Sequence, residues 1–332
     1  SLLTYKIYNM HSKHKYLIPI KTTLGPKGWI ENKEVIEPYL IEERGLYKGE
    51  SSLLLRPKTT EEISNILKIC NKNNIKIVPQ GGRTGLCGGT IPSETGKEVI
   101  LSLERMNKIK SFNEENFTIT VEAGCILSNI QNTVDKKNFL FPLSLASEGS
   151  CTIGGNLSTN AGGINVLRYG MARDLVLGIE VVLANGEILK NLTSLRKDNR
   201  GYDLKHLFMG SEGTLGIITS AVLKLFPAPR YIETALLAIP NPEAAIKLFG
   251  MARNASADLL NAYELVSRIG MEMVLKHIPN TKEPMKNTYK WYVLLEISSS
   301  SENNLRKQIE NLFQLAIDKN IVLDGIIAES SQ

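Results

Sequence analysis

The sequence predicts an α+β protein made of two consecutive domains, and three observations support this expectation. The chain has 332 residues, which corresponds to about two domains at roughly 150 residues per domain. Strand-like apolar runs alternate with segments of helical periodicity along its length. The break Pro227-Ala228-Pro229 separates two different patterns of elements, so we place a domain boundary there.

The first domain should begin with a β-α-β pattern. Thr59 and Glu62 have the spacing of a capping box, which predicts a helix from Thr59 up to Asn73-Asn74. A β-rich run at 75–79 follows. Asn185-Gly186 is expected to turn one strand into the next. The other expected strands are 98–103, 117–121, 175–183, 187–189 and 216–226, and the expected helices are 126–137 and 203–209, the latter capped by Asp203.

The second domain should also alternate strands and helices, as a second α+β layer. Its expected strands are 232–239, 259–265, 291–297 and 321–327, and its helices begin at Pro242, end near His277 and cover 304–319. We therefore divide the chain into an extension at 1–46, a first domain at 47–229 and a second, incomplete domain at 230–332.

Composition excludes several classes of protein. The chain is 42% hydrophobic and 22% charged, which is typical of a globular protein and not of a disordered one. Its net charge of +5 is mild and spread along the sequence, so nucleic acid is not an expected partner. The four cysteines form no C-x-x-C pair, and no apolar run approaches the roughly 20 residues of a membrane span.

The start of the chain leaves two alternatives open. Residues 1–30 begin with Ser1 and contain five lysines but no acidic residue. This pattern is compatible with the remnant of a transit segment, or simply with a lysine-rich start in a lysine-rich chain. The absence of an initial Met suggests a fragment.

The first candidate site is Pro79-Gln80-Gly81-Gly82-Arg83-Thr84-Gly85-Leu86-Cys87-Gly88-Gly89, directly after an expected strand. Glycine loses more backbone entropy on folding than other residues, so this density of glycine indicates that something approaches the backbone closely. Exposed N–H groups in such a loop can hold an anion, and Arg83 and Thr84 would add donors for a pyrophosphate. The stretch matches neither the P-loop nor the dinucleotide-binding Rossmann pattern, and a plain glycine turn stays an alternative.

The second candidate site runs from Gly149 to Gly163. Two Gly-Gly pairs alternate there with Thr152, Asn156, Thr159 and Asn160. We expect a flat ribbon, rich in donors, that could follow the edge of a planar heterocycle. Two glycine stretches in one domain favour a large cofactor that carries phosphate.

A third stretch joins Arg196-Lys-Asp-Asn-Arg-Gly-Tyr-Asp-Leu to Gly210-Ser-Glu-Gly-Thr-Leu-Gly-Ile-Ile-Thr. The spacing of Gly210, Gly213 and Gly216 allows the backbone to pass close to a neighbour before the next strand. A purely structural role is equally compatible with this pattern.

Together these stretches resemble the flavin-binding domain of the vanillyl-alcohol-oxidase/p-cresol-methylhydroxylase superfamily. Within it, Arg56-Pro-Lys-Thr-Thr-Glu-Glu-Ile, Pro79-Gln-Gly-Gly-Arg-Thr-Gly-Leu, Ser194-Leu-Arg-Lys-Asp-Asn and Gly201-Tyr-Asp-Leu-Lys most resemble the FAD-dependent D-2-hydroxyglutarate dehydrogenases. D-lactate dehydrogenases and the flavoprotein subunit of glycolate oxidase share the glycine signatures. The resemblance implies a two-subdomain FAD-binding domain of the p-cresol-methylhydroxylase type, followed by part of an α+β cap domain.

The resemblance also implies the residues of the cofactor site. Gly81 to Gly85 would hold the FAD pyrophosphate, and the second stretch would line the flavin and its ribityl chain. Binding should be noncovalent, because the first loop lacks the histidine to which related proteins attach flavin. The candidate cofactor residues are Pro79, Gly81, Gly82, Arg83, Thr84, Gly85, Leu86, Gly149, Ser150, Gly154, Gly155, Asn156, Thr159, Asn160, Gly163, Glu212, Gly213 and Ile217.

The His-rich segment that supplies a base and metal ligands in this family is absent from the sequence. The four histidines are His11, His14, His206 and His277, and we expect His206 on a helix surface and His277 at a helix end. We assign no metal ligand in this chain. The catalytic residues, and ligands for a divalent metal, are expected beyond Gln332.

The expected reaction is oxidation of a D-2-hydroxy acid, D-2-hydroxyglutarate above all, with hydride transfer to the flavin N5 and reoxidation by electron-transfer flavoprotein or another carrier. D-lactate or glycolate oxidation is the alternative within enzymes, and a noncatalytic flavin-binding subunit is the alternative outside them. We expect a homodimer as one option for assembly. The expected compartment is the cytoplasm if the protein is bacterial and the mitochondrial matrix if it is eukaryotic.

Overall fold

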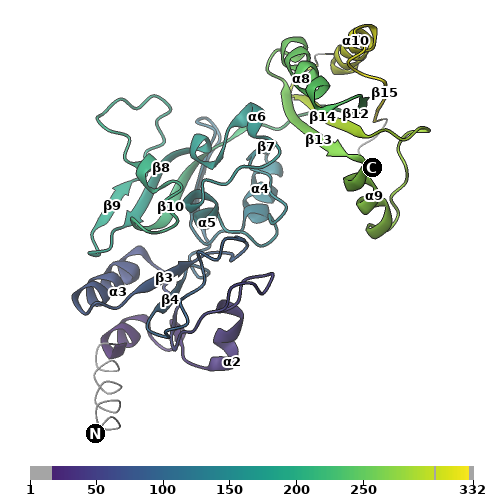
Figure 1. Cartoon of the computed structure of the whole chain (residues 1–332). Helices are drawn as coiled ribbons and strands as arrows, with labels where there is room; N and C mark the ends of the chain where they lie inside the picture. Colours follow the sequence, from purple (N-terminus) through teal and green to yellow (C-terminus); the bar gives the residue numbers. More distant parts are fainter. Residues whose placement is uncertain (1–16, 303, 329–332) are drawn as a thin grey trace. The chain divides into compact units, whose positions relative to one another are not determined.

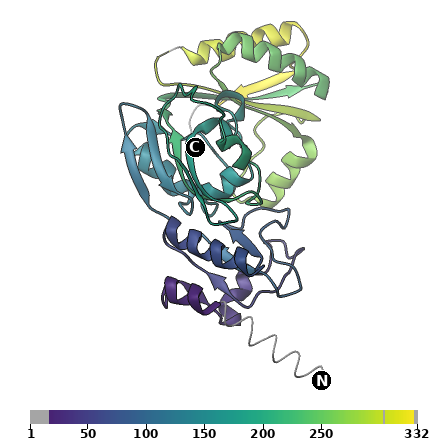
Figure 2. The ribbon, with the colours of Figure 1, turned by 90° about the vertical axis from the view of Figure 1, so that its left-hand side faces the viewer.

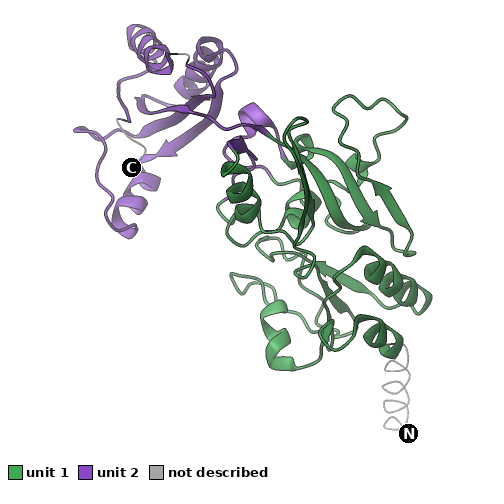
Figure 3. Cartoon of the chain, turned by 180° about the vertical axis from the view of Figure 1, so that it is seen from behind, with its two compact units in different colours: residues 1–137, 146–161, 172–225 green, residues 138–145, 162–171, 226–332 purple. Residues whose placement is uncertain are grey.

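The computed structural model describes residues 17–302 and 304–328, which form two compact units. Unit 1 consists of residues 1–137, 146–161 and 172–225, and unit 2 of residues 138–145, 162–171 and 226–332 (Figure 3). The chain therefore passes several times from one unit to the other. The domain limits at 46 and 229 stay a prediction, since the units follow spatial proximity and not sequence order.

The first sheet of unit 1 has the strand order β1-β2-β4-β3, of which Figure 1 labels β3 and β4. β2 and β3 are both parallel to β4, so the expected β-α-β arrangement is confirmed. The strands are β1 (Trp29–Ile30), β2 (Leu54–Leu55), β3 (Ile77–Gln80) and β4 (Val99–Ser102). Before β2 come the short helix α2 (Lys33–Ile36) and the 3-10 helix η1 (Glu37–Tyr39), which the sequence did not indicate.

Helix α3 (Thr60–Lys72) covers this sheet and begins where the capping box predicts. The Thr59 hydroxyl accepts a hydrogen bond of 3.1 Å from the Glu62 backbone N–H, and the Glu62 carboxylate accepts one of 2.7 Å from the Lys58 N–H. The first bond satisfies a backbone donor that the first turn of a helix leaves unpaired, and the second holds the segment that leads into the helix. Apolar residues at helical spacing on α3 are buried against the strands.

The second sheet of unit 1 is five-stranded and antiparallel, in the order β5-β6-β10-β8-β9. Two of its inner strands, β8 and β10, are buried almost throughout, which matches their largely apolar sequence. The strands are β5 (Ile109–Asn113), β6 (Thr118–Glu122), β8 (Val176–Val182), β9 (Ile188–Asn191) and β10 (Ile217–Lys224). Unit 1 also contains α4 (Leu127–Asp135), α5 (Ile153–Ser158), η2 (Ala172–Leu175) and α7 (Lys205–Phe208).

Unit 2 contains a four-stranded antiparallel sheet in the order β13-β14-β12-β15. Helices α8 and α10 lie together on one face of it (Figures 1 and 2), around a shared apolar core. Met271 of α9 packs against the opposite face. The elements are β12 (Tyr231–Ile239), α8 (Pro242–Ser256), β13 (Leu260–Ser267), α9 (Arg268–His277), β14 (Trp291–Ser299), α10 (Leu305–Asp318) and β15 (Asp324–Ile327). This arrangement confirms the expected α+β layer.

Unit 2 also includes three short elements. Two of them precede β8 in the sequence, and one follows β10. β7 (Phe139–Leu140) pairs with β11 (Phe226–Pro227), and α6 (Val166–Tyr169) packs on β13. The Arg168 guanidinium donates hydrogen bonds to the Ser298 carbonyl oxygen at 2.7 Å and to its hydroxyl at 3.0 Å. This contact attaches α6 to the sheet of unit 2.

Two expectations about local structure were wrong. The second glycine stretch is not a flat ribbon, because residues 153–158 of it form helix α5. Asp203 does not cap the following helix: the N-cap of α7 is Leu204, and the Asp203 carboxylate pairs with Lys205 instead. None of the helices in residues 17–302 and 304–328 combines the length and hydrophobicity that a membrane-spanning helix requires.

Candidate functional site

The loop after β3 offers a continuous row of backbone donors. No backbone N–H group of residues 81–90 donates a hydrogen bond to any residue that the structure describes. Arg83 has φ +59°, in the left-handed region, within this row. Successive N–H groups in a loop with such a residue form a concavity that binds anions. The loop is thus suited to a group with several negatively charged oxygens.

Gly81 and Gly82 bring this loop against the second glycine stretch. A Cβ on Gly81 would lie 2.4 Å from the Thr152 hydroxyl, and one on Gly82 would lie 2.3 Å from the Ser150 carbonyl oxygen. Neither distance is possible for a real side chain. Glycine at both positions is therefore required by the contact between the two stretches.

Helix α5 is held tightly against the strand end at Ala123. The backbone N–H groups of Ile153 and Gly154 donate to the carbonyl oxygens of Cys125 and Ala123, and a Cβ on Gly154 would lie 2.6 Å from that of Ala123. The N-cap residue Thr152 is buried, and its hydroxyl has no hydrogen-bond partner among the described residues. A buried, unpaired hydroxyl is unfavourable unless a ligand forms a hydrogen bond with it.

The third stretch joins the other two at the end of α5. The Glu212 N–H donates to the Ser158 carbonyl oxygen at 2.9 Å, and Glu212 has φ +53°. Gly213 has φ +77°, and a Cβ there would lie 2.7 Å from Pro79 Cγ. The left-handed backbone of Glu212, a residue with a side chain, is strain of a kind that is frequent at functional sites. All three glycine-containing stretches therefore meet in unit 1.

Two cavities lie beside this meeting point, and Gly81 lines both of them. The first has a volume of about 390 Å³ and the second about 570 Å³. The candidate residues that line the first are Pro79, Gly81, Gly85, Leu86, Gly154, Gly155, Thr159, Glu212, Gly213 and Ile217. Those that line the second are Gly81, Gly82, Arg83, Gly149 and Ser150.

Four candidate residues line neither cavity. Thr84 is half-buried in the first loop, and Asn156 is buried, with its amide 3.5 Å from Cys151 Sγ. The Asn160 side-chain oxygen accepts a hydrogen bond of 3.0 Å from the Arg173 N–H. Gly163 belongs to unit 2, where a Cβ would lie 1.6 Å from the Ser144 carbonyl oxygen. In the structure these contacts give Asn156, Asn160 and Gly163 local packing roles.

The Arg83 side chain stacks on an aromatic ring. Its guanidinium carbon lies 4.1 Å from the centre of the Tyr39 ring, and the Tyr39 hydroxyl donates a hydrogen bond of 2.9 Å to the Glu104 carboxylate. Burial and this hydrogen bond raise the pKa of Tyr39. The expected diphosphate donor is thus held in a stacked pair beside the second cavity, where Glu104 is also a lining residue.

Sequence reasoning missed Gln80, Tyr39 and Glu104. Gln80 is 1% exposed, and its amide donates to the carbonyl oxygens of Tyr39 and Thr90, while its side-chain oxygen is buried and unpaired among the described residues. Gln80 thereby fixes both ends of the loop. The position of Gln80 directly before Gly81 was a usable signal. No local pattern indicated Tyr39, which lies in η1, or Glu104, which follows β4.

The donor set suits FAD better than a metal ion. A row of N–H groups, an unpaired buried hydroxyl and two adjoining cavities fit an elongated ligand that carries phosphate. Among residues 17–302 and 304–328, no group of three or more His, Cys, Asp and Glu side chains could hold a metal ion. His206 and His277 line neither cavity.

Comparison with protein families agrees with this fit. Residues 51–191 match the family described as FAD binding domain, and residues 228–332 match the C-terminal domain of FAD linked oxidases. The chain is 42% identical over 309 residues to the mitochondrial D-2-hydroxyglutarate dehydrogenase of Arabidopsis thaliana, covering 93% of this chain and 55% of the relative. It is 42% identical over 281 residues to the enzyme of that name from Rattus norvegicus, covering 85% and 52%.

A further relative is the putative mitochondrial D-lactate dehydrogenase of Schizosaccharomyces pombe, 39% identical over 294 residues, covering 89% of this chain and 55% of the relative. The chain spans about half the length of these curated relatives.

Solved structures show the same fold. Alkyldihydroxyacetonephosphate synthase superposes with a TM-score of 0.77 at 19% identity, covering 93% of this chain and 59% of that one. Substrate-bound p-cresol methylhydroxylase gives a TM-score of 0.74 at 19% identity, covering 95% and 65%. The chain therefore combines a match to the FAD binding domain with a match to the C-terminal domain of FAD linked oxidases, and its fold is that of p-cresol methylhydroxylase.

Proposed function

We propose that this chain is the flavin-binding part of an FAD-dependent 2-hydroxy-acid dehydrogenase that oxidises D-2-hydroxyglutarate to 2-oxoglutarate. The observation that supports cofactor binding most directly is the row of unpaired N–H groups at 81–90 beside two cavities. The substrate proposal is supported by relatives named D-2-hydroxyglutarate dehydrogenase at 42% identity.

Each part of the proposed site has a defined task. The N–H groups of the first loop would hold the diphosphate, and the Thr152 hydroxyl and Gln80 side-chain oxygen, both unpaired, would complete polar contacts to the cofactor. The apolar residues Leu86 and Ile217 would exclude water from the first cavity. FAD, when bound, supplies the acceptor for the hydride that leaves C2 of the substrate.

We further propose that FAD is held noncovalently. Neither described histidine lines the two cavities, and the first loop contains none. We assign no catalytic base to the described residues. A separate electron carrier would reoxidise the flavin, and the compartment would be mitochondrial in a eukaryote, as the names of the relatives suggest.

Oxidation of D-lactate is the second candidate, favoured by the name of the Schizosaccharomyces pombe relative. The two substrates differ in a second carboxylate. A comparison of flavin reduction by D-2-hydroxyglutarate and by D-lactate, at equal concentration and without oxygen, distinguishes them.

The decisive experiment is the absorption spectrum of the purified full chain with FAD, before and after anaerobic addition of D-2-hydroxyglutarate. We expect flavin bands that stay with the protein on gel filtration and disappear from it on acid denaturation. Bleaching of these bands by the substrate would show in addition that this chain by itself carries out the hydride transfer. Protein without flavin bands after FAD is added in excess would contradict the cofactor proposal. Bands that persist with every 2-hydroxy acid would contradict catalysis by this chain and favour a noncatalytic flavin-binding subunit.

A further inference from the structure

A third cavity lies at the other end of the five-stranded sheet. It has a volume of about 350 Å³ and shares no lining residue with the two cavities of the cofactor site. Val176 at the start of β8, Asn191 at the end of β9 and Lys224 at the end of β10 line it. The first residues of β10, Ile217 and Ile218, line the cofactor cavity instead. We call this third space the basic cavity.

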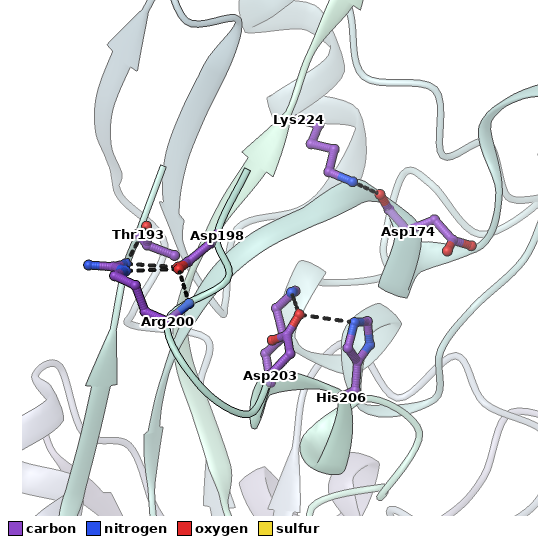
Figure 4. A network of polar contacts seen from close by, with 8 residues as sticks. Asp174, Thr193, Asp198, Arg200, Asp203, His206 and Lys224 are labelled. Carbon is purple, nitrogen blue, oxygen red and sulfur yellow. Dashed lines mark hydrogen bonds and ion pairs between the residues drawn. The ribbon is translucent and has the colours of Figure 1, made fainter. Parts of the chain in front are cut away.

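Cations outnumber carboxylates around the basic cavity. Its lining includes Arg196, Arg200, Lys205 and Lys224, but only two acidic residues, Asp198 and Asp203. Both acidic side chains are already paired (Figure 4). Asp198 receives two hydrogen bonds of 2.8 Å from the Arg200 guanidinium, and Asp203 pairs with Lys205, whose side chain is 12% exposed.

The side chains of Arg196 and Lys224 form no ion pair with a carboxylate of any described residue. The Arg196 guanidinium donates only long hydrogen bonds, of 3.4 Å, to the carbonyl oxygens of Asn116 and Phe117, and the Lys224 ammonium donates to the Asp174 carbonyl oxygen. Burial lowers the pKa of Lys224, and the neighbouring charges of Lys205 and Arg196 lower it further, ahead of the opposing effect of Asp174 and Asp203. These cations are therefore close enough to repel one another.

We propose that the basic cavity binds a small dianion of phosphate or dicarboxylate chemistry, held between Arg196 and Lys224. An anion there would relieve the repulsion and give both cations a charged hydrogen-bond acceptor. The Thr193 hydroxyl and the Asn191 amide, which also line the cavity, provide neutral donors for the remaining oxygens. The volume of about 350 Å³ admits a small organic dianion.

The test is calorimetric titration of the full chain with inorganic phosphate and, separately, with succinate, at an ionic strength held constant by sodium chloride. Saturable binding of either anion that depends on Arg196 and Lys224 is expected, and the anion that binds more tightly identifies the chemistry. Arg196→Gln should weaken this binding by about tenfold or more, because it removes a charged donor, whereas Arg196→Lys should keep most of it.

Arg105→Gln is the matched control. The Arg105 guanidinium also donates to backbone carbonyl oxygens, at 2.8 and 3.2 Å, but it lies outside the basic cavity. This variant should bind the anion as the unmodified chain does.

Two results would overturn the proposal. One is the absence of saturable binding of both anions at constant ionic strength. The other is undiminished binding in the double variant Arg196→Gln, Lys224→Gln, which would place the anion elsewhere, such as the loop at 81–90. Circular dichroism and the melting temperature of each variant without anion establish that it is folded, and a misfolded double variant is replaced by Arg196→Gln alone, for which the same criterion holds.

Discussion

The Thr60 hydroxyl donates a hydrogen bond of 2.7 Å to the Glu180 carboxylate, and this bond joins the two sheets of unit 1. Thr60 lies in the first turn of α3, on the first sheet, and Glu180 lies in the middle of β8, in the second. Glu180 is 5% exposed and also accepts a hydrogen bond of 2.8 Å from the Thr219 hydroxyl of β10. The first cofactor cavity is lined by strand residues of both sheets, Gln80 of β3 and Ile217 of β10, so this contact helps to set its shape.

Replacement of Glu180 should make stability less dependent on pH. Burial would raise the pKa of Glu180, but hydrogen bonds from Thr60 and Thr219 and the charge of Lys110 lower it below its usual value. A carboxyl whose pKa is lowered by folding stabilises the protein above its unfolded pKa, and this contribution is lost as the pH falls through the lower, folded value.

Glu180→Gln should therefore cost about 1–3 kcal/mol at neutral pH and progressively less in acid. Melting temperatures from about pH 7 down to about pH 3 measure the difference. Glu115→Gln, at an exposed turn position, is the control and should change little. A Glu180→Gln variant as stable as the unmodified chain at neutral pH would show that the contact between the sheets is unimportant.

Gly82→Ala should destabilise unit 1 even without cofactor. The added Cβ would lie 2.3 Å from the Ser150 carbonyl oxygen and 2.7 Å from Cys151 Cα, and backbone atoms cannot move aside easily. The expected loss is about 1–3 kcal/mol, measured by urea unfolding of the chain without FAD. A Cβ on Gly85, in the same loop, would meet nothing within 4 Å, so Gly85→Ala should unfold like the unmodified chain.

Thr152→Val should separate stability from cofactor binding. The Thr152 hydroxyl is buried and unpaired among the described residues, so its removal should leave the stability of the FAD-free chain unchanged or raise it. If FAD forms a hydrogen bond with this hydroxyl, the affinity of the Thr152→Val variant for FAD should fall roughly threefold to tenfold. Fluorescence titration with FAD measures the change. The control Thr133→Val removes a hydroxyl of α4 that donates an exposed hydrogen bond to the Asn129 carbonyl oxygen, and FAD affinity should not change.

Cys87 should be the fast-reacting thiol of the folded chain, and FAD should protect it. Cys87 is exposed and lines the first cavity, whereas Cys70, Cys125 and Cys151 are buried. Burial raises the pKa of Cys70 to about 12 and that of Cys125 to about 11, which leaves little reactive thiolate. Labelling with a thiol reagent, followed by mass spectrometry, should locate one early adduct at Cys87. An equal labelling rate with and without saturating FAD would place the cofactor away from the first cavity.

The sequence predicts an element well where a local signal decides it. The capping residues Thr59 and Glu62 locate the start of α3, and Asn185-Gly186 locates the turn between β8 and β9. Helix α5 escapes prediction because Gly154 and Gly155 disfavour a helix locally, while close packing of Gly154 on Ala123 stabilises it. The local sequence cannot predict a contact between residues that lie far apart in the chain.

In the candidate site, too, local sequence predicts some features, and others depend on residues that are distant in the chain. The glycine stretches identify which backbone comes together, since close contact requires the absence of a side chain. The stacking of Arg83 on Tyr39 joins residues 44 positions apart (83 − 39), and nothing in either segment indicates the other.

The interleaving of the two units in the sequence constrains the order in which the protein can fold during synthesis. β7 and α6 leave the ribosome before β8, but their partners, β11 and β13, are made only after β10 is complete. Unit 2 therefore cannot complete its folding before the whole five-stranded sheet of unit 1 has been synthesised, and β7 and α6 stay unpaired until then. For the same reason no single cut of the chain separates the units intact: a gene fragment that begins at residue 230 would lack β7, α6 and β11.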